Sequence, residues 1–256
     1  MVPYEKFAEI PFFLRSMNPT TSEPVRRATP PNAIAYHEQL STEWEGRYQK
    51  RSFQSRIAVL EECLEGVNLA GTQWLDAGCG TGTLSRLLAE KGCSVVGLDA
   101  APGMIELAQK EAGGLESRLR FEVVETIAQL PNADAALDGI LCSSVLEYVG
   151  DVERCLSEFT RVLKPGGHLL ISVPNSESVI RRGQVVAYYL GRGIGRRWLE
   201  FVQYSKNEYT MGELDALLAG HDFVVKKAIR FGSPIPRWLQ RRRLGGSLLM
   251  VLAVRL

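Results

Sequence analysis

Apolar and polar positions alternate with two different periods through the middle of the chain. Short apolar runs, typical of buried strands, occupy residues 73–77, 94–98, 119–124, 138–143 and 167–173. Between them, apolar residues recur at helical spacing in 83–90, 102–112 and 151–163. Further helices are expected at 32–51, 53–65 and 210–219, and an antiparallel pair of strands at 222–230 and 245–255. This alternation predicts an α/β fold whose mostly parallel sheet carries helices on both faces.

A glycine-rich turn joins the first predicted strand to the helix that begins at Thr83. Its three glycines stand on alternate residues, 78, 80 and 82, and let the backbone turn sharply and approach a ligand closely. The G-x-G-x-x-G dinucleotide fingerprint is absent, because position 83 is Thr. Asp76 would repel a pyrophosphate, and Asp99 ends the next strand, where doubly wound folds bind ribose hydroxyls. A ribose with a positively charged head and no phosphates describes S-adenosylmethionine.

Four blocks of sequence resemble the class I S-adenosylmethionine-dependent methyltransferases. They are LDAGCGTG (75–82), GLDAAPGMIELA (97–108), ILCSSVLEYV (140–149) and RVLKPGGHLLISVPN (161–175). Among these enzymes the chain is most similar to the small-molecule branch that includes the demethylubiquinol O-methyltransferases of ubiquinone biosynthesis. The resemblance implies a Rossmann-like seven-stranded sheet of order 3-2-1-4-5-7-6. It also implies one domain over 32–256, with a helical cap at 32–66 and an insertion at 176–205 after strand five. Before this domain, five prolines within residues 1–30 and the lack of sustained periodicity predict a flexible arm at 1–31.

The same resemblance implies where the cofactor binds. Arg56, in the helix before the first strand, would neutralise the methionine carboxylate, and Thr126 or the Ile127 amide would read the adenine in place of a more usual Asp. The full set of expected cofactor-binding residues is Arg56, Asp76, Gly78, Cys79, Gly80, Gly82, Asp99, Ala100, Met104, Thr126, Ile127 and Ser143.

Two residues are candidates for catalysis. Tyr148 stands where many relatives carry a histidine; a phenol with a pKa near 10 is a poor base, but it can orient a substrate oxygen. His37 is the alternative base. A third possibility is that the reaction needs little help from a base. Positioning alone can lower the barrier by about 7–11 kcal/mol, whereas a general base typically raises the rate by about 10²–10⁴-fold.

Composition and motifs indicate which cofactors, location and partners to expect. The five cysteines and three histidines show no metal-ligand spacing, so no metal is expected. With no run of eighteen apolar residues and no convincing secretion signal, the expected location is the cytoplasm. No nucleic-acid-binding module is visible, so no nucleic acid partner is expected.

Charge is unevenly spread although the formal net charge is only +1. From residue 176 onward there are 14 Lys and Arg against 6 Asp and Glu, while the preceding residues hold 16 and 23. Within 176–205, Arg181, Arg182, Arg192, Arg196 and Arg197 accompany aliphatic and aromatic residues. The segment is interpreted either as a lid over the substrate or as a peripheral contact with an anionic membrane.

The sequence therefore predicts a methyltransferase that uses S-adenosylmethionine and acts on a small molecule. The expected reaction is O-methylation of a phenol, catechol or quinol. The alternatives are N- or C-methylation of a specialised metabolite, and a non-catalytic partner subunit that only binds the cofactor.

Overall fold

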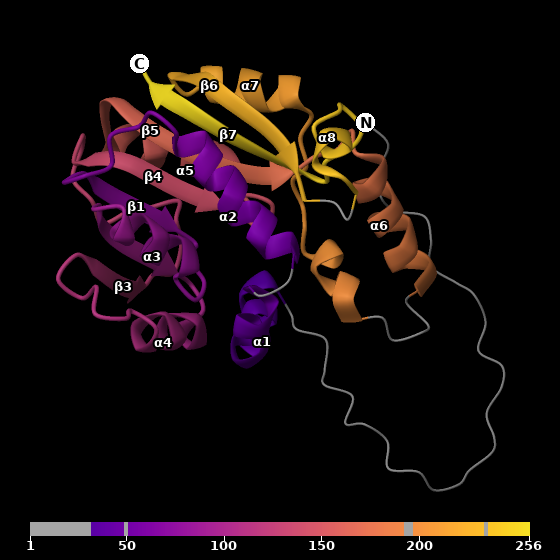
Figure 1. Cartoon of the computed structure of the whole chain (residues 1–256), viewed down its shortest axis with the longest axis horizontal. Helices are drawn as coiled ribbons and strands as arrows, with labels where there is room; N and C mark the ends of the chain where they lie inside the picture. The colour runs from indigo at the N-terminus through magenta and orange to yellow at the C-terminus, as the bar shows by residue number, and fades with distance from the viewer. Residues whose placement is uncertain (1–31, 49–50, 192–196, 233–234) are drawn as a thin grey trace, which may run out of the picture.

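The computed structural model describes residues 32–48, 51–191, 197–232 and 235–256 (Figure 1). The expected arm at 1–31 lies outside these residues, as do Arg192 and Arg196 of the insertion. None of the helices in the described ranges is both long enough and apolar enough to cross a membrane.

A single seven-stranded sheet forms the centre of the molecule. Its strands are β1 (Gln73–Ala77), β2 (Ser94–Asp99), β3 (Leu119–Val123), β4 (Leu137–Ser143), β5 (Leu163–Pro174), β6 (Phe223–Phe231) and β7 (Leu248–Arg255). Their order is β3-β2-β1-β4-β5-β7-β6, with β1 to β5 parallel and β7 antiparallel to both of its neighbours. The predicted strand order and the predicted antiparallel closing pair are confirmed. Because the order reverses between β1 and β4, a crevice is expected at the carboxyl ends of these strands.

Helices cover both faces of the sheet. They are α1 (Ala33–Tyr48), α2 (Arg51–Leu64), α3 (Thr83–Glu90), α4 (Pro102–Lys110), α5 (Val152–Val162), α6 (Val179–Gly191), α7 (Met211–Ala219) and α8 (Arg237–Gln240), with a 3-10 helix η1 (Arg197–Gln203). On one face α2, α3 and α4 bury residues such as Leu60, Leu88 and Ile105, and on the other α5 and α7 bury Phe159 and Leu218. Alternate residues of each strand contribute to the two cores, as period-two strands buried on both sides must.

The junction of α5 and β5 differs from its prediction. The helix ends at Val162 and the strand already begins at Leu163, four residues before the predicted start. Leu163 pairs with Leu137, and the ladder then shifts so that Gly139 pairs with His168. Pro165 has no amide hydrogen to donate, and Gly166 takes a φ of 79°, so these residues form the irregularity inside the strand instead of a loop before it.

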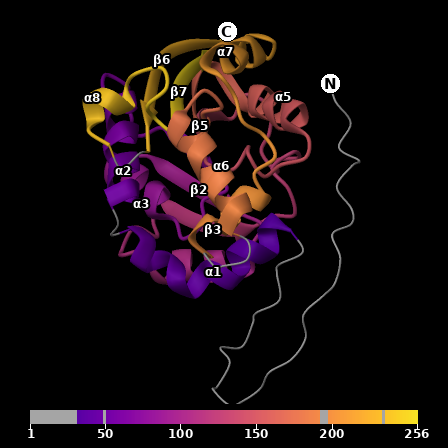
Figure 2. The same ribbon diagram turned by 90° about the vertical axis from the view of Figure 1, so that its right-hand side faces the viewer.

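The segment after β5 forms α6 and η1, which lie beyond the carboxyl ends of the parallel strands (Figures 1 and 2). From the other end of the chain, α1 reaches the same place: its Tyr36 and Leu40 pack with Tyr204 and Phe201 in a small apolar cluster. Asn32 starts α1, because its side chain accepts a hydrogen bond from the Ala35 amide at 2.9 Å. Segments far apart in sequence thus enclose one edge of the sheet.

Candidate active site

A cavity of about 570 Å³ lies at this edge of the sheet. It is lined by α1, α2, the glycine turn, the ends of β2, β3 and β4, α6 and η1. Of the fourteen residues expected to bind the cofactor or to act in catalysis, thirteen line it: His37, Arg56, Asp76, Gly78, Cys79, Gly80, Asp99, Ala100, Met104, Thr126, Ile127, Ser143 and Tyr148. A volume of this size suits a small-molecule site.

The glycine turn needs all three glycines, but for different reasons. Each has a positive φ (82° at Gly78, 54° at Gly80, 74° at Gly82), a conformation that side chains rarely adopt. A Cβ on Gly78 would also lie 2.2 Å from the Val145 side chain. Gly82, which was also expected at the cofactor, is not among the residues that line the cavity. A Cβ there would lie 2.4 Å from the Phe121 ring, so its role is to let the turn pack on β3.

Asp99 holds the turn together from the end of β2. Its Oδ2 accepts a hydrogen bond from the Gly80 amide at 2.8 Å, and its Oδ1 accepts one from the Ala101 amide at 2.9 Å. A carboxylate has about four acceptor positions, so both oxygens can accept a further hydrogen bond. Asp99 can therefore bind vicinal hydroxyls while it fixes the backbone around them.

Asp76 is a buried carboxyl group at the carboxyl end of β1. The Ser85 hydroxyl donates to its Oδ2 at 2.6 Å. Burial and the neighbouring Asp99 nevertheless raise the pKa of Asp76 to about 7, against an ordinary value of 3.8. A cationic ligand would relieve this cost. The two carboxyl groups, together with the open glycine backbone, fit a ligand with an ammonium, a sulfonium and a ribose better than one with a pyrophosphate.

Arg56 joins α2 to the ends of β4 and β5 at the floor of the cavity. Its Nη1 donates to Ser143 Oγ at 3.0 Å and to Ser144 Oγ at 2.8 Å. Ser143 Oγ is in turn 3.0 Å from Ser172 Oγ of β5. Ser144 has a φ of 57°, so this network holds a strained residue in the cavity wall.

Tyr148 and His37 meet at another part of the wall. Their ring centroids are 5.1 Å apart, edge to face, and His37 also packs against Tyr36. Burial holds the pKa of the Tyr148 phenol well above its usual range, so this group stays protonated. His37 Nδ1 lies 2.9 Å from the Ala33 carbonyl oxygen, which fixes a hydrogen on Nδ1.

Two charged residues of the cavity were not predicted as site residues. Arg181 was named only as one of the arginines of the segment 176–205, but its side chain is just 3% exposed and pairs with Glu208 at 2.6 Å. Glu147 is 4% exposed and lines the same cavity. The helical pattern of 176–205 could not show which face of α6 turns inward, since this depends on contacts with η1 and the segment after it.

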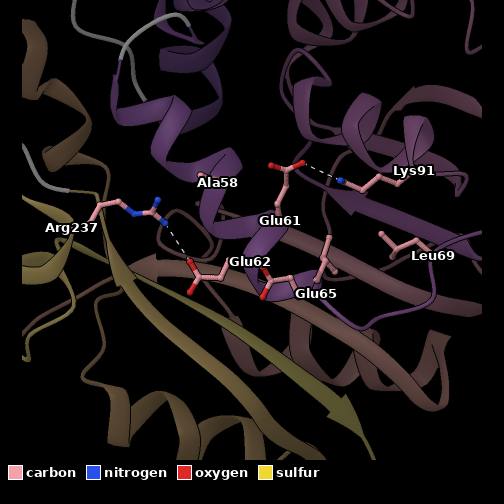
Figure 3. A pocket seen from close by; sticks show the side chains of 8 residues that line it. Ala58, Glu61, Glu62, Glu65, Leu69, Lys91 and Arg237 are labelled. Atoms are coloured by element: carbon pink, nitrogen blue, oxygen red, sulfur yellow. Dashed lines mark hydrogen bonds and ion pairs between the residues drawn. The ribbon is translucent and has the colours of Figure 1, made fainter.

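A second hollow, of about 670 Å³, lies away from the glycine turn on the outer side of α2 (Figure 3). Its acidic residues have partners: Glu61 pairs with Lys91 at 3.0 Å, and Glu62 with Arg237 at 3.3 Å. Within the described residues, no group of three or more His, Cys, Asp or Glu could hold a metal ion.

Comparison with known proteins agrees with this geometry. Residues 75–171 match the sequence model of the methyltransferase domain family. Residues 75–171 therefore belong to a methyltransferase domain. The match covers the glycine turn and the strands β1 to β4, which supply most of the cavity wall. It confirms the predicted family and, with it, S-adenosylmethionine as the cofactor class.

Two relatives of known name are similar to part of this chain. The malonyl-[acyl-carrier protein] O-methyltransferase of Serratia marcescens is 39% identical over 107 residues, 42% of this chain and 40% of that protein. The ubiquinone biosynthesis O-methyltransferase of Alkalilimnicola ehrlichii is 28% identical over 169 residues, 64% of this chain and 67% of that protein. The alignments thus span between two fifths and two thirds of these relatives, whose names give different acceptors.

A solved structure shares the fold of the methyltransferase domain. It is an S-adenosylmethionine dependent methyltransferase from Mesorhizobium loti, with a TM-score of 0.58 at 22% identity, over 77% of this chain and 96% of that one.

Proposed function

We propose that this protein transfers a methyl group from S-adenosylmethionine to an oxygen of a small aromatic acceptor of the phenol, catechol or quinol type. The observation that carries the proposal is one continuous cavity. It has an acidic glycine turn on one side and a cluster of Tyr148, His37 and Arg181 on the other. The first side suits the cofactor, and the second offers aromatic faces and polar groups to a ring that bears oxygen. The relatives named above are both O-methyltransferases.

Each part of the cofactor would have a partner among the residues of the cavity. Asp76 would face the ammonium, Asp99 the ribose hydroxyls and Arg56 the carboxylate. Thr126 and Ile127 would contact the adenine. The bound cofactor supplies a methyl group on a sulfonium, which is a good leaving group. Tyr148, as a neutral phenol, would donate a hydrogen bond to the acceptor and orient it.

A labelled-methyl transfer assay tests the proposal. Purified protein would be offered catechols, quinols, phenols and amines with labelled cofactor. Turnover on an oxygen acceptor is the expected result. Turnover on amines alone would favour the alternative of N-methylation. Cofactor binding without turnover on any acceptor would favour a non-catalytic partner subunit.

We also propose that α6 makes a peripheral contact with an anionic membrane. Its outward face carries Val179, Val186, Tyr189 and Leu190, each more than half exposed, beside the exposed Arg182. Leu244, half exposed, continues this face, because its carbonyl oxygen accepts a hydrogen bond from the Val179 amide at 3.1 Å. An apolar face next to arginine suits the headgroup boundary. It would bring a membrane-borne quinol close to the cavity, which Arg181 and Gln184 of the same helix line.

A further inference from the structure

One buried carboxyl group of the cavity is not needed to bind the cofactor. Glu147 follows β4 and is 4% exposed. Its Oε2 has no hydrogen-bond partner among the described residues, although the Ser144 hydroxyl bonds to the carboxyl group. A buried polar atom without a partner costs about 1–3 kcal/mol. Because Glu147 lines the cavity, a group bound there is a candidate partner for this carboxyl group.

The backbone of the turn that carries Glu147 is held by hydrogen bonds from residues 206 and 207. The Glu147 carbonyl oxygen accepts a hydrogen bond from the Lys206 amide at 2.7 Å. Asn207 Nδ2 donates to the carbonyl oxygens of Leu146 and Val149 at 2.8 and 2.9 Å. The backbone on both sides of Glu147 is therefore fixed. This suits a group that must meet its ligand in one geometry.

Charged groups from several elements act on this carboxyl group. Arg56 of α2 and Arg181 of α6 favour its ionised form, and Glu208 partly neutralises Arg181. Tyr148 and Cys142 are its neutral titratable neighbours. Burial is the largest effect and raises the pKa of Glu147 to about 7. The group can thus change protonation near neutral pH, as a general base does.

We propose that Glu147 is the catalytic base and accepts the proton of the acceptor hydroxyl; this inference rests on the proposed function. The acceptor O–H bond breaks, the proton moves to the Glu147 carboxylate, and the electron pair stays on the oxygen. That oxygen forms the new bond to the methyl carbon. The carbon–sulfur bond breaks with its electron pair left on sulfur, so the sulfonium becomes a neutral thioether. Protonated Glu147 then returns its proton to water.

The experiment compares Glu147→Gln, which keeps the shape of the side chain, with wild type on a catechol. Loss of the base should lower kcat by about 10²–10⁴-fold. With S-adenosylmethionine saturating at every pH, kcat/KM of wild type for the catechol should rise with pH with a midpoint near 7, and the variant should lose this rise. Glu147→Asp should recover part of kcat, and cofactor affinity should stay within twofold. Glu90→Gln, at the exposed end of α3, is the matched control and should behave as wild type.

Failure of the inference can be told apart from failure of the proposed function. If Glu147→Gln keeps kcat within threefold of wild type with an unchanged pH profile, the inference is overturned while O-methylation stands. If wild type methylates no oxygen acceptor, O-methylation fails, and equilibrium binding of catechol in the presence of S-adenosylhomocysteine decides on Glu147. Loss of a charge-assisted hydrogen bond should weaken that binding by about tenfold in Glu147→Gln. Equal affinity would refute any contact between Glu147 and the acceptor.

Discussion

Burial and a cationic ligand would have opposite effects on the pKa of Asp76. Its pKa is raised to about 7 by burial and by Asp99, and the Ser85 hydroxyl is what favours the ionised form. An ammonium binds the ionised carboxylate, so below pH 7 binding must first remove a proton. We expect the affinity of wild type for S-adenosylmethionine to fall by up to about tenfold per pH unit between pH 7 and 5.5. Calorimetry across this range measures it.

The matched variant Asp76→Asn should bind the cofactor more weakly, with an affinity that no longer changes with pH. Without ligand, however, the Asp76→Asn variant should be more stable than wild type at high pH. When folding raises the pKa of a carboxyl group, ionisation of that group destabilises the folded state. The destabilisation begins as the pH rises above the unfolded pKa and is complete above the folded pKa. The change from 3.8 to about 7 corresponds to roughly 4 kcal/mol. Asp76→Asn should therefore raise the Tm at pH 8 and leave it unchanged near pH 3. The same pH slope in both proteins would contradict the role of Asp76.

We propose that Asp99 has both a structural and a ligand-binding role, so its two simplest variants should differ. Asp99→Ala removes the acceptor for the Gly80 and Ala101 amides as well as any contact with the ribose. At about 1.5–3 kcal/mol for a hydrogen bond to a charged group, we expect a loss of cofactor affinity of at least a hundredfold. Asp99→Asn keeps one acceptor oxygen and should lose less. Unchanged affinity of Asp99→Ala by calorimetry would refute the assignment.

Residues of the cofactor side could be predicted because their place follows from local sequence. Asp76 and Asp99 end parallel strands, and such ends meet at one edge of a sheet. Gly82 belongs to the same motif, but its environment is set by Phe121 on β3, which the motif does not contain. Glu147 gave an even weaker signal. Its orphan oxygen results from how α2, α6 and the segment at 204–209 meet, and no local pattern encodes that meeting.

Among the elements, α2 is fixed to the C-terminal part of the chain by a charged brace. Arg241 donates to both oxygens of Glu62 at 2.8 and 2.6 Å. Arg237 adds a contact with Glu62 at 3.3 Å (Figure 3). The Arg241 hydrogen bonds hold the pKa of Glu62 below its usual value. We expect Glu62→Gln to cost about 1–2 kcal/mol at pH 7 and to lower the Tm by roughly 3–6 °C.

The stability difference between wild type and Glu62→Gln should depend on pH. Because folding lowers the pKa of Glu62, the stability that it contributes is present above the unfolded pKa and is lost as pH falls through the folded value. The difference between wild type and Glu62→Gln should thus disappear in acid. Glu61→Gln is the control on the same helix, since its pair with Lys91 is more exposed and should contribute little. Equal Tm losses in both variants would argue against a specific brace.

Elements could be located from sequence better than they could be oriented. The period of apolar residues was enough for β1, α3 and the closing strands. It failed at Leu163–Gly167, where pairing with β4 extends β5 through a proline and two glycines. In α6 the sequence did not distinguish the neighbouring arginines, yet Arg181 is buried and paired with Glu208 while Arg182 is exposed. A tertiary ion pair of this kind is decided by residues 27 positions apart.

At the scale of the whole molecule, the uneven charge of the sequence is partly balanced by pairing. Arg237 and Arg241 face Glu62, Lys227 faces Glu65, and Arg243 faces Glu177. Three of these four pairs join the basic C-terminal part to the acidic N-terminal part. The excess of bases after residue 176 is therefore a poor measure of the charge that an anionic surface would meet. Attraction to a membrane must come more from apolar contact than from net charge.

This comparison leads to a prediction for the α6 face. Leu190 is 79% and Tyr189 53% exposed, and burying such side chains gains about 1.5 kcal/mol each, against about 1 kcal/mol for one basic residue. We expect a Tyr189→Ser/Leu190→Ser variant to lose more than a hundredfold in affinity for anionic vesicles, and Arg182→Gln about fivefold. Vesicle co-sedimentation at low and high salt measures both, with turnover on a soluble catechol as the control. If high salt alone abolished binding, or if Arg182→Gln lost more than the double variant, the contact would be electrostatic and the apolar face would belong to a lid.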